Sequence, residues 1–388
     1  MNILVIGNGF DLAHRLPTKY SDFLKFVQAY ELYANSKMGE TEKYYDYFNR
    51  LKNKKLLLFA EIGDLIKDNL WIRYFQSILA ERSEAGKDGW IDFESEISVI
   101  IQTLDEVRIN AAPKFKEGEE RVRIDNKHSI ILDTIFTKGQ IGSTYYNKKT
   151  ITYQKTLLLD DLNRLTRLLE IYLADYVPTL YDTCNYLTEI QALDIHGVLS
   201  FNYTDTYQKL YDRVAHVEYD YIHGKADVEH TIEDCNLILG IDEYLGGDAQ
   251  RKDNAFIQFK KFYQRIYKKT GCKYIDWLRD SIEQRRMTPA GNRSETQPRY
   301  NIYIYGHSLD ITDGDIIGRL ITNADTRTTI FYHNNDALGS QIANLVKIIG
   351  EQKLIEMTEG SDAAIVFKQS SSEITTIATD SKARIVAN

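Results

Sequence analysis

The sequence contains few cysteines and few prolines. Its 388 residues include three cysteines, which lie far apart and form no Cys-x-x-Cys pair. A disulfide framework needs a larger, even set of cysteines, and a structural zinc site needs closely paired Cys or His ligands. We therefore expect neither a disulfide framework nor a metal site. Proline is limited to five residues, which is unlike a disordered or linker-rich chain.

Long apolar runs and an excess of positive charge are also missing. No segment approaches the ~20 consecutive apolar residues of a transmembrane helix, and no signal-peptide pattern opens the chain. We therefore expect a cytoplasmic protein without a membrane partner. Acidic residues number 56 and basic residues 48, which gives a formal net charge of −8. Because nucleic-acid binding needs a basic face to neutralise phosphates, nucleic acid is not the expected partner.

The sequence does contain short apolar runs that end in glycine or polar residues. The first, at residues 2–6, is continuous enough for a strand of a parallel sheet covered on both faces. Similar runs recur later, with amphipathic stretches between several of them, at residues 197–201, 216–222, 237–241, 302–305, 329–332 and 363–367. Alternating strands and helices predict an α/β protein with a Rossmann-like, doubly wound parallel sheet.

Residues between about 20 and 190 follow a different pattern. Apolar side chains recur there at helical spacing, as at Phe23, Phe26, Val27 and Tyr30, apart from a predicted hairpin near 120–153. We therefore predict a discontinuous nucleotide-binding domain at 1–20 and 190–368, with a mainly helical insertion at 21–189. The Ser- and Thr-rich residues 369–388 are expected to form a flexible tail.

The first predicted strand ends in the loop Gly7-Asn8-Gly9, followed by Phe10 and Asp11. Two glycines allow the backbone to approach a ligand, and the amides at the start of the next helix favour an anion. Leu12 occupies the position of the third glycine in the dinucleotide fingerprint. This substitution argues against an ordinary dehydrogenase.

Polar residues also follow later strands. Asn202 has an amide that can hold a hydroxyl group or a water molecule, although both Asn202 and Asp205 equally suit the cap of a following helix. His223 is suited to proton transfer near neutral pH, and its alternative is a structural role. Since ligands of such sheets bind at the carboxyl ends of the strands, these residues are candidates for one site.

Two more strand ends complete this set. The segment Gly306-His307-Ser308 combines a glycine with a hydroxyl group, which fits a phosphate or ribose contact. Asn334 follows the run at 329–332 and is a candidate for contact with a nucleoside ribose. Each strand end is ambiguous by itself. Five polar strand ends in one predicted sheet are harder to explain by helix capping alone, and they favour a small-molecule nucleotide ligand.

The run from Ile6 to Phe23 resembles the start of the AbiH family of bacterial phage-defence proteins. Further blocks resemble that family in the same order, at 90–94, 200–205, 222–224 and 306–309. AbiH proteins in turn resemble the sirtuin-like NAD-binding fold. Gly7 and Gly9 match its first motif, and Leu16-Pro17 falls at the spacing of its Ile-Pro. Asn202 matches its catalytic Asn, His223-Gly224 its catalytic His-Gly, and Gly306-x-Ser308 its NAD-contacting loop.

The sequence departs from the sirtuin pattern in three places. Asp11 stands where a serine is expected, Asp205 lies one residue late, and the four zinc cysteines are missing. The resemblance without the zinc module implies an NAD hydrolase that cleaves the nicotinamide–ribose bond and depletes NAD. Asn202 and His223 would be catalytic, and no metal would take part. The NAD-binding residues implied are Gly7, Asn8, Gly9, Phe10, Asp11, Asp205, Gly306, His307 and Ser308, with Asn334 at the adenosine ribose.

Three alternatives stay open at this point. The protein could bind a nucleotide without cleaving it, as a sensor or scaffold whose helical insertion serves a homo-oligomer or a phage-derived trigger protein. It could be a nuclease that uses Asp92, Glu94 and Glu96, although the motif at 90–94 also fits the packing face of a helix, with Asp92 and Glu94 in salt bridges. His14 and Arg15 suit either a phosphate contact or the surface.

Overall fold

The structure is a computed structural model, and it describes residues 1–84, 91–136, 145–241, 254–279, 300–323, 326–370 and 374–375. The chain divides into two compact units, which are described separately. The sheet unit comprises Met1–Thr18, Val177–Lys225 and Thr270–Asn388, and the helical unit comprises Lys19–Tyr176 and Ala226–Lys269.

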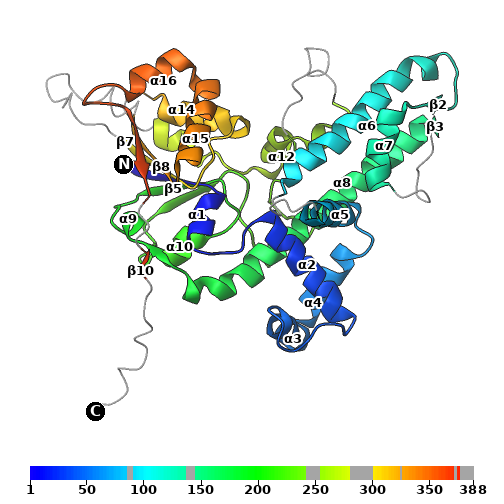
Figure 1. Ribbon diagram of the computed structural model, residues 1–388, viewed down its shortest axis with the longest axis horizontal. Helices are drawn as coiled ribbons and strands as arrows, with labels where there is room; N and C mark the ends of the chain where they lie inside the picture. Colours follow the sequence, from blue (N-terminus) through cyan, green and yellow to red (C-terminus); the bar gives the residue numbers. More distant parts are fainter. Residues whose placement is uncertain are drawn as a thin grey trace. The chain divides into compact units, whose positions relative to one another are not determined.

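The sheet unit is built on six parallel strands (Figure 1). In chain order they are β1 (Asn2–Ile6), β5 (Gly197–Ser200), β6 (Glu218–Tyr221), β7 (Tyr300–Tyr305), β8 (Thr326–Tyr332) and β9 (Ile365–Gln369). Their order across the sheet is β6-β5-β1-β7-β8-β9, so the direction of winding reverses between β1 and β7. The predicted parallel α/β sheet is therefore confirmed. Crevices that accept ligands form at such reversals, at the carboxyl ends of the strands.

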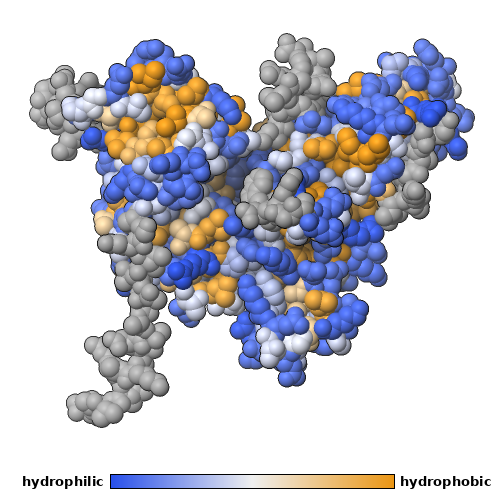
Figure 2. Space-filling model, viewed as in Figure 1, coloured by the Kyte–Doolittle hydropathy of each residue, from blue (hydrophilic) through white to orange (hydrophobic). Residues whose placement is uncertain are grey.

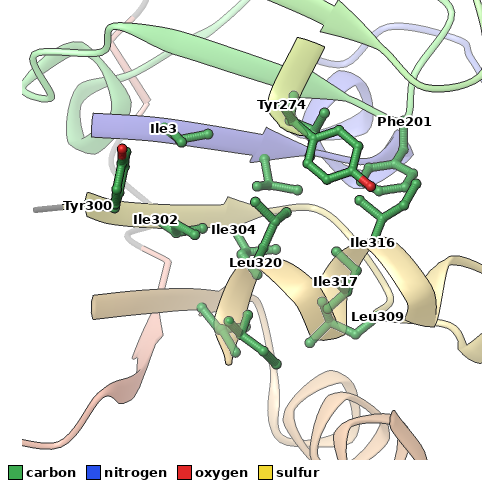
Figure 3. Packing of buried hydrophobic residues seen from close by; sticks show 14 of the residues in the cluster. Ile3, Phe201, Tyr274, Tyr300, Ile302, Ile304, Leu309, Ile316, Ile317 and Leu320 are labelled. Atoms are coloured by element: carbon green, nitrogen blue, oxygen red, sulfur yellow. The ribbon is translucent and has the colours of Figure 1, made fainter. Parts of the chain in front are cut away.

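Both faces of the sheet are covered, because successive side chains of β1 point to opposite sides. Ile3 and Val5 join a buried cluster with residues of the helices α14 (Gly314–Ile321), α15 (Asn335–Ile349) and α16 (Glu351–Thr358), which Figure 3 shows in part. Leu4 and Ile6 join a second cluster with residues of α1 (Asn8–Ala13), α9 (Thr188–Gln191) and α10 (Thr206–Leu210). The continuous apolar run at 2–6 is thus explained by burial on two sides.

Some apolar surface stays open on the sheet unit. Figure 2 shows apolar side chains over α14, α15 and α16, and Ile342, Val346 and Ile355 are each more than a third exposed. Scattered exposed aliphatic side chains of this kind are ordinary on protein surfaces.

The smaller elements of the sheet unit are η2 (Val177–Thr183), β4 (Tyr186–Leu187), η5 (Ile311–Asp313) and β10 (Ile374–Thr375). β4 and β10 pair antiparallel. Gln369, the first residue of the predicted tail, is the last residue of β9, and the Ser370 amide donates to the Tyr332 carbonyl at 2.8 Å. Most of the predicted tail lies outside the described residues.

The helical unit is made mainly of α-helices, as the spacing of its apolar residues predicts. They are α2 (Tyr20–Ala34), α3 (Tyr45–Lys54), α4 (Leu56–Ile66), α5 (Leu70–Glu84), α6 (Phe93–Lys116), α7 (Asn126–Ile135), α8 (Lys148–Ile171) and α12 (Lys261–Lys268), with the π-helical turn η1 (Tyr172–Tyr176) and the 3₁₀ turn η3 (Ile257–Phe259). The hairpin predicted near 120–153 corresponds to an antiparallel pair, β2 (Val122–Arg123) and β3 (Tyr145–Tyr146), with α7 between its strands.

The boundaries of the units differ from the predicted ones in three places, the first being Lys19 and Tyr20, which belong to the helical unit. Residues 177–189 belong to the sheet unit, and residues 226–269 belong to the helical unit although they fall within the predicted sheet domain. The strand predicted at 237–241 is therefore wrong, because the only pairing there is an isolated bridge between Ile241 and Lys260. The run is apolar because it is buried, and the Gln264 side chain bonds both the amide and the carbonyl of Leu239 at 3.1 Å in place of a neighbouring strand.

The Trp90-Ile-Asp-Phe-Glu94 motif lies at the start of α6, with Trp90 outside the described residues. Phe93 is fully buried, and its ring stacks between those of Tyr20 and Phe75, with centroids 4.2 and 4.0 Å away. The interpretation of this motif as a packing face is confirmed for Phe93.

In the sheet unit, glycine allows the loops after β1 and β7 to contact each other. The Gly9 amide donates to the Gly306 carbonyl at 2.8 Å, and the Gly7 amide donates to the Tyr305 carbonyl at 3.2 Å. Gly306 has φ +66°, and a Cβ atom there would overlap the Phe10 amide nitrogen. A Cβ atom on Gly9 would lie only 2.7 Å from the Gly306 Cα. The backbones can approach this closely only without side chains.

We expect Gly306→Ala to destabilise the sheet unit by at least about 2 kcal/mol, because a left-handed conformation and a backbone overlap are imposed together. Gly339→Ala is the matched control. Gly339 lies within α15, with nothing within 4 Å of an added Cβ, so alanine there should stabilise by about 0.5–1 kcal/mol. Urea unfolding of both variants measures the difference, and equal effects would contradict the role given to Gly306.

Candidate functional site

Four loops of the sheet unit lie at the carboxyl ends of β1, β5, β6 and β7. These site loops comprise residues 7–11, 200–205, 221–224 and 306–313. Ile6 is level with Ser200 and with Tyr305, and Ser200 is level with Tyr221. The four strands therefore end at the same height, and the predicted residues at their ends gather at one edge of the sheet.

The most distinctive arrangement is a carboxylate between two histidines. His223 Nε2 lies 3.3 Å from Asp313 Oδ1, and His307 Nε2 lies 3.4 Å from Asp313 Oδ2. His223 follows β6, His307 follows β7, and Asp313 ends the short turn η5. All three residues are buried. The fold thus joins two predicted residues, His223 and His307, through a third that was not among the predicted site residues.

Hydrogen bonds from the two histidines keep the Asp313 carboxyl ionised. Burial by itself raises the pKa of Asp313, but hydrogen bonds from His223 and His307 and their charges outweigh it and hold the pKa well below 3.8. The Leu309 amide donates to His307 Nδ1 at 2.9 Å, which assigns the proton of this ring to Nε2, facing Asp313. Because the Asp313 carboxylate can only accept, His223 also presents Nε2–H to it, and Nδ1 is then the basic nitrogen of a neutral His223 ring.

Phe201 forms the apolar contact of this group. Its ring meets the His307 ring edge to face at 4.4 Å and the His223 ring at 5.6 Å between centroids. Phe201 is 8% exposed. One aromatic ring therefore packs against both imidazoles.

Asn202, predicted to be catalytic, connects two of the site loops. Its Nδ2 donates to the Gly7 carbonyl at 2.9 Å, and its amide donates to Ser200 Oγ at 3.1 Å. The residue is 5% exposed. In the described state the side-chain amide holds the loop after β1, so a contact of Asn202 Nδ2 with water or ribose would require this bond to exchange.

Asp11 is a buried acid with one unsatisfied oxygen. Thr204 Oγ1 donates to Asp11 Oδ2 at 2.6 Å, whereas Asp11 Oδ1 has no partner among the residues that the structure describes. Burial raises the pKa of Asp11 to about 6, against the lowering effects of Thr204, Thr206 and Asn202, and the charge of Asp205 adds to the rise. A buried acceptor without a donor is costly, so this oxygen suits the hydroxyl group of a ligand.

Asp205 lies in a charged network. Its Oδ1 accepts a hydrogen bond from the Tyr181 hydroxyl at 3.0 Å. Its Oδ2 lies 3.7 Å from Lys225 Nζ and 3.9 Å from Lys209 Nζ. The predicted capping by its side chain is not observed at the start of α10.

Several backbone amides of the predicted NAD-binding residues donate within the protein in this state. Besides the amides of Gly7 and Gly9, the Phe10 amide donates to the Gly7 carbonyl at 2.8 Å, and the Phe10 ring is wholly buried in the core. Asn8 and Ser308 are exposed, and Asn8 Oδ1 accepts a hydrogen bond from Thr18 at 2.7 Å. The solvent-facing polar groups of these two loops therefore include Asn8 and Ser308.

Two other candidates have local structural partners. Asn334 Oδ1 accepts the Ala337 amide at 2.8 Å and caps α15. His14 is neither a phosphate ligand nor a surface residue, because it is fully buried, donates from Nδ1 to the Phe10 carbonyl and accepts from the Tyr211 hydroxyl, both at 2.7 Å. Burial lowers the pKa of His14 to about 4, so the ring is neutral.

The three acids considered for a nuclease are engaged within the helical unit. Asp92 caps α6 through the Glu94 amide, Glu94 pairs with Lys261, and Glu96 pairs with Arg82. Within the described ranges, no group of three or more His, Cys, Asp or Glu residues is arranged to hold a metal ion. The contacts of these acids are those of a helix cap and salt bridges.

The site residues that sequence reasoning missed are mainly Asp313 and Thr204. Asp313 is one of three acids within six residues, with Asp310 and Asp315, and nothing in the sequence distinguishes it from its neighbours. Thr204 lies between the predicted residues Asn202 and Asp205, but no sequence motif indicates a role for it. Their partners, His223 and Asp11, follow other strands of the sheet, so only the three-dimensional fold could identify Asp313 and Thr204.

The sheet unit and its site define an α/β protein with a buried histidine–carboxylate group at the edge of a parallel sheet. The family model for bacteriophage abortive infection AbiH matches residues 3–333. The chain therefore belongs to the AbiH family, as its motifs predicted, and its function lies in abortive infection by phage. No curated protein and no solved structure matches the chain significantly. Among the helices that the structure describes, none combines the length and apolarity needed to cross a bilayer.

We expect the Asp11 carboxyl to make stability depend on pH. Its pKa is raised on folding, so the native state binds more protons between about pH 4 and 6, and stability falls as the pH rises through that window. Asp11→Asn should remove this slope and gain about 1–3 kcal/mol at neutral pH. Urea unfolding at several pH values tests this, with the exposed Asp362→Asn as control. A variant at Asp11 that keeps the wild-type slope would refute the assignment.

Proposed function

We propose that this AbiH protein is an NAD hydrolase that cleaves the nicotinamide–ribose bond and depletes cellular NAD during phage infection. Counted along the chain, the strand order of the sheet is 3-2-1-4-5-6, which is the order of Rossmann dinucleotide-binding sheets. The resemblance of its motifs to the sirtuin-like fold adds NAD as the expected nucleotide. The candidate site lies where ligands of such sheets bind.

The single observation that carries the proposal is the contact of His223 with Asp313. Cleavage of the glycosidic bond builds positive charge on the ribose as nicotinamide departs, and a water molecule then bonds to the anomeric carbon. Its proton passes to His223, and the products are nicotinamide, ADP-ribose and a proton. Asp313, an anion at neutral pH, stabilises the imidazolium that His223 becomes. His307 donates to the other oxygen of Asp313 and fixes its orientation.

The remaining residues bind and orient the substrate in this proposal. Asn202 positions the water or the ribose, and Asp11 Oδ1 accepts a ribose hydroxyl, which supplies its missing donor. Ser308 and Asn8 contact the diphosphate with the loops of Gly7, Gly9 and Gly306. Asp205 and Asn334 complete the nucleotide contacts.

The hydrogen bonds of the glycine loops favour a resting state. Diphosphate can use the Gly9 amide only after this amide leaves the Gly306 carbonyl. Likewise, Asn202 can reach the substrate only after its bond to Gly7 exchanges. We therefore propose that the described state is inactive, and that a phage-derived trigger protein or self-association shifts the loops.

The second candidate function is a nucleotide sensor or scaffold that binds NAD or a related nucleotide without cleaving it. The observation that favours it is the same use of the loop amides within the protein, together with a buried acid, Asp11, near the expected diphosphate. In this case the histidine–carboxylate group would be structural.

Incubation of the purified protein with NAD, with and without extract of phage-infected cells, should release nicotinamide and ADP-ribose, measured by chromatography. His223→Ala should lower the rate by about 10²–10⁴-fold, the size of general-base effects, and Asp313→Asn should lower it comparably. His216→Ala is the matched control, since His216 is a more exposed histidine of the same unit outside the site loops.

Absence of nicotinamide release in every condition would refute the hydrolase. Isothermal titration with NAD then decides the second candidate. Saturable binding that Asp11→Ala weakens supports a sensor, and no binding excludes NAD as the ligand.

A further inference from the structure

The chain passes between the two units four times. The crossings lie at residues 18/19, 176/177, 225/226 and 269/270. A helical insertion usually needs only two connections, and it can be joined at any loop of its host. The positions of these four crossings relative to the site loops are therefore informative.

The first two crossings are fastened to the site loops by hydrogen bonds. Thr18, the last residue before the first crossing, donates from Oγ1 to Asn8 Oδ1 at 2.7 Å. Tyr181, the fifth residue after the second crossing, donates from its hydroxyl to Asp205 Oδ1 at 3.0 Å. Each bond joins a crossing to a predicted site residue.

The other two crossings both connect to the loop that carries His223, the third through the chain itself and the fourth through a hydrogen bond. Lys225 follows His223 and Gly224 directly, precedes the third crossing, and lies 3.7 Å from Asp205 Oδ2 through Nζ. Thr270, the first residue after the fourth crossing, donates from Oγ1 to the Ile222 carbonyl at 3.1 Å. Gly271, at φ +60°, lies so close that a Cβ atom would be 2.6 Å from the Ile222 Cα. All four crossings thus end on site loops.

On the helical side, the third crossing runs into a buried clamp. Arg167 of α8 is 1% exposed and donates to the carbonyls of Asp227 and Val228 at 3.0 and 2.9 Å. Its charge is balanced by Glu61 and Glu170, each at 2.8 Å. Asp227 is only four residues beyond His223.

Glu170 completes this Arg167 clamp from the same helix. It is fully buried, and its Oε1 accepts hydrogen bonds from His230 Nδ1 at 2.6 Å and from the Asp227 amide at 3.3 Å. Buried ion pairs often add little stability compared with apolar packing of the same volume, but they fix the geometry of what they bind. What the clamp specifically fixes is the segment 227–230.

We propose that the helical unit regulates the candidate site. Conformational changes of the helical unit are transmitted to the site loops through the four crossings, and the Arg167 clamp is the main link to His223. A partner that shifts α8 would move residues 227–230, and the short connection would carry that shift to His223. Coupling of this kind is reciprocal, so a ligand in the site would also alter the clamp. The proposal goes beyond NAD cleavage, because it holds for any ligand of the site.

Hydrogen exchange of the full chain, followed by mass spectrometry, tests the coupling without any ligand. His230→Ala removes one contact of Glu170 on the clamped segment. We expect the amides of residues 221–225 to exchange about threefold faster or more, while β7 keeps its wild-type protection. Glu61→Gln, which loosens Arg167 from α4, should produce the same change and serves if His230→Ala folds poorly.

His128→Ala is the matched control. His128 also bridges two carboxylates of the helical unit, Asp125 and Glu106, at 2.7 and 2.8 Å, but it contacts no crossing in the described residues. Its substitution should leave residues 221–225 unchanged. If His230→Ala and Glu61→Gln speed exchange only at 226–231, or if His128→Ala has the same effect, the proposal is overturned. Because no NAD is used, this failure is distinguishable from the failure of the hydrolase.

Discussion

The arrangement of the site loops in the sheet unit depends on the hydrogen bond from the Gly9 amide to the Gly306 carbonyl. At the reversal of strand order, the loops after β1 and β7 meet backbone to backbone, and only glycine leaves room for this contact. His307 follows Gly306 directly, Asn202 bonds the Gly7 carbonyl, and Asp313 lies between His307 and His223. The position of the buried Asp313 carboxylate therefore depends on a backbone contact between two glycines, Gly9 and Gly306.

Much of the sheet could be predicted from the sequence, because a strand buried on two faces leaves a short continuous apolar run. The run at 237–241 shows the limit of that signal. It is equally apolar, but its backbone is satisfied by the amide of Gln264, and a side chain acting as a strand partner leaves no periodic trace. The extent of the helical unit was hidden for a similar reason, since Arg167 and Glu170 capture a distant segment through polar contacts.

Of the residues that gather at the candidate site, His223 and His307 could be named from the sequence, because each follows the end of a strand. The site was not predictable where the partner comes from elsewhere, as for Asp313, or where a predicted donor is already used, as for Asn202 and the loop amides. Sequence patterns identify which donors and acceptors are present. Which of them are already used in internal hydrogen bonds is known only from the folded structure.

The position of β1 has a consequence for the making of the protein. Ile3 pairs with Gly197 on one side and with Ile302 on the other, so the central strand of the sheet is made first and must wait for both neighbours. At ordinary rates of protein synthesis, that wait is on the order of tens of seconds. Until β7 leaves the ribosome, Asp313 and His307 are absent and the site cannot assemble. The candidate site of a growing chain can therefore form only after residues 306–313 have been made.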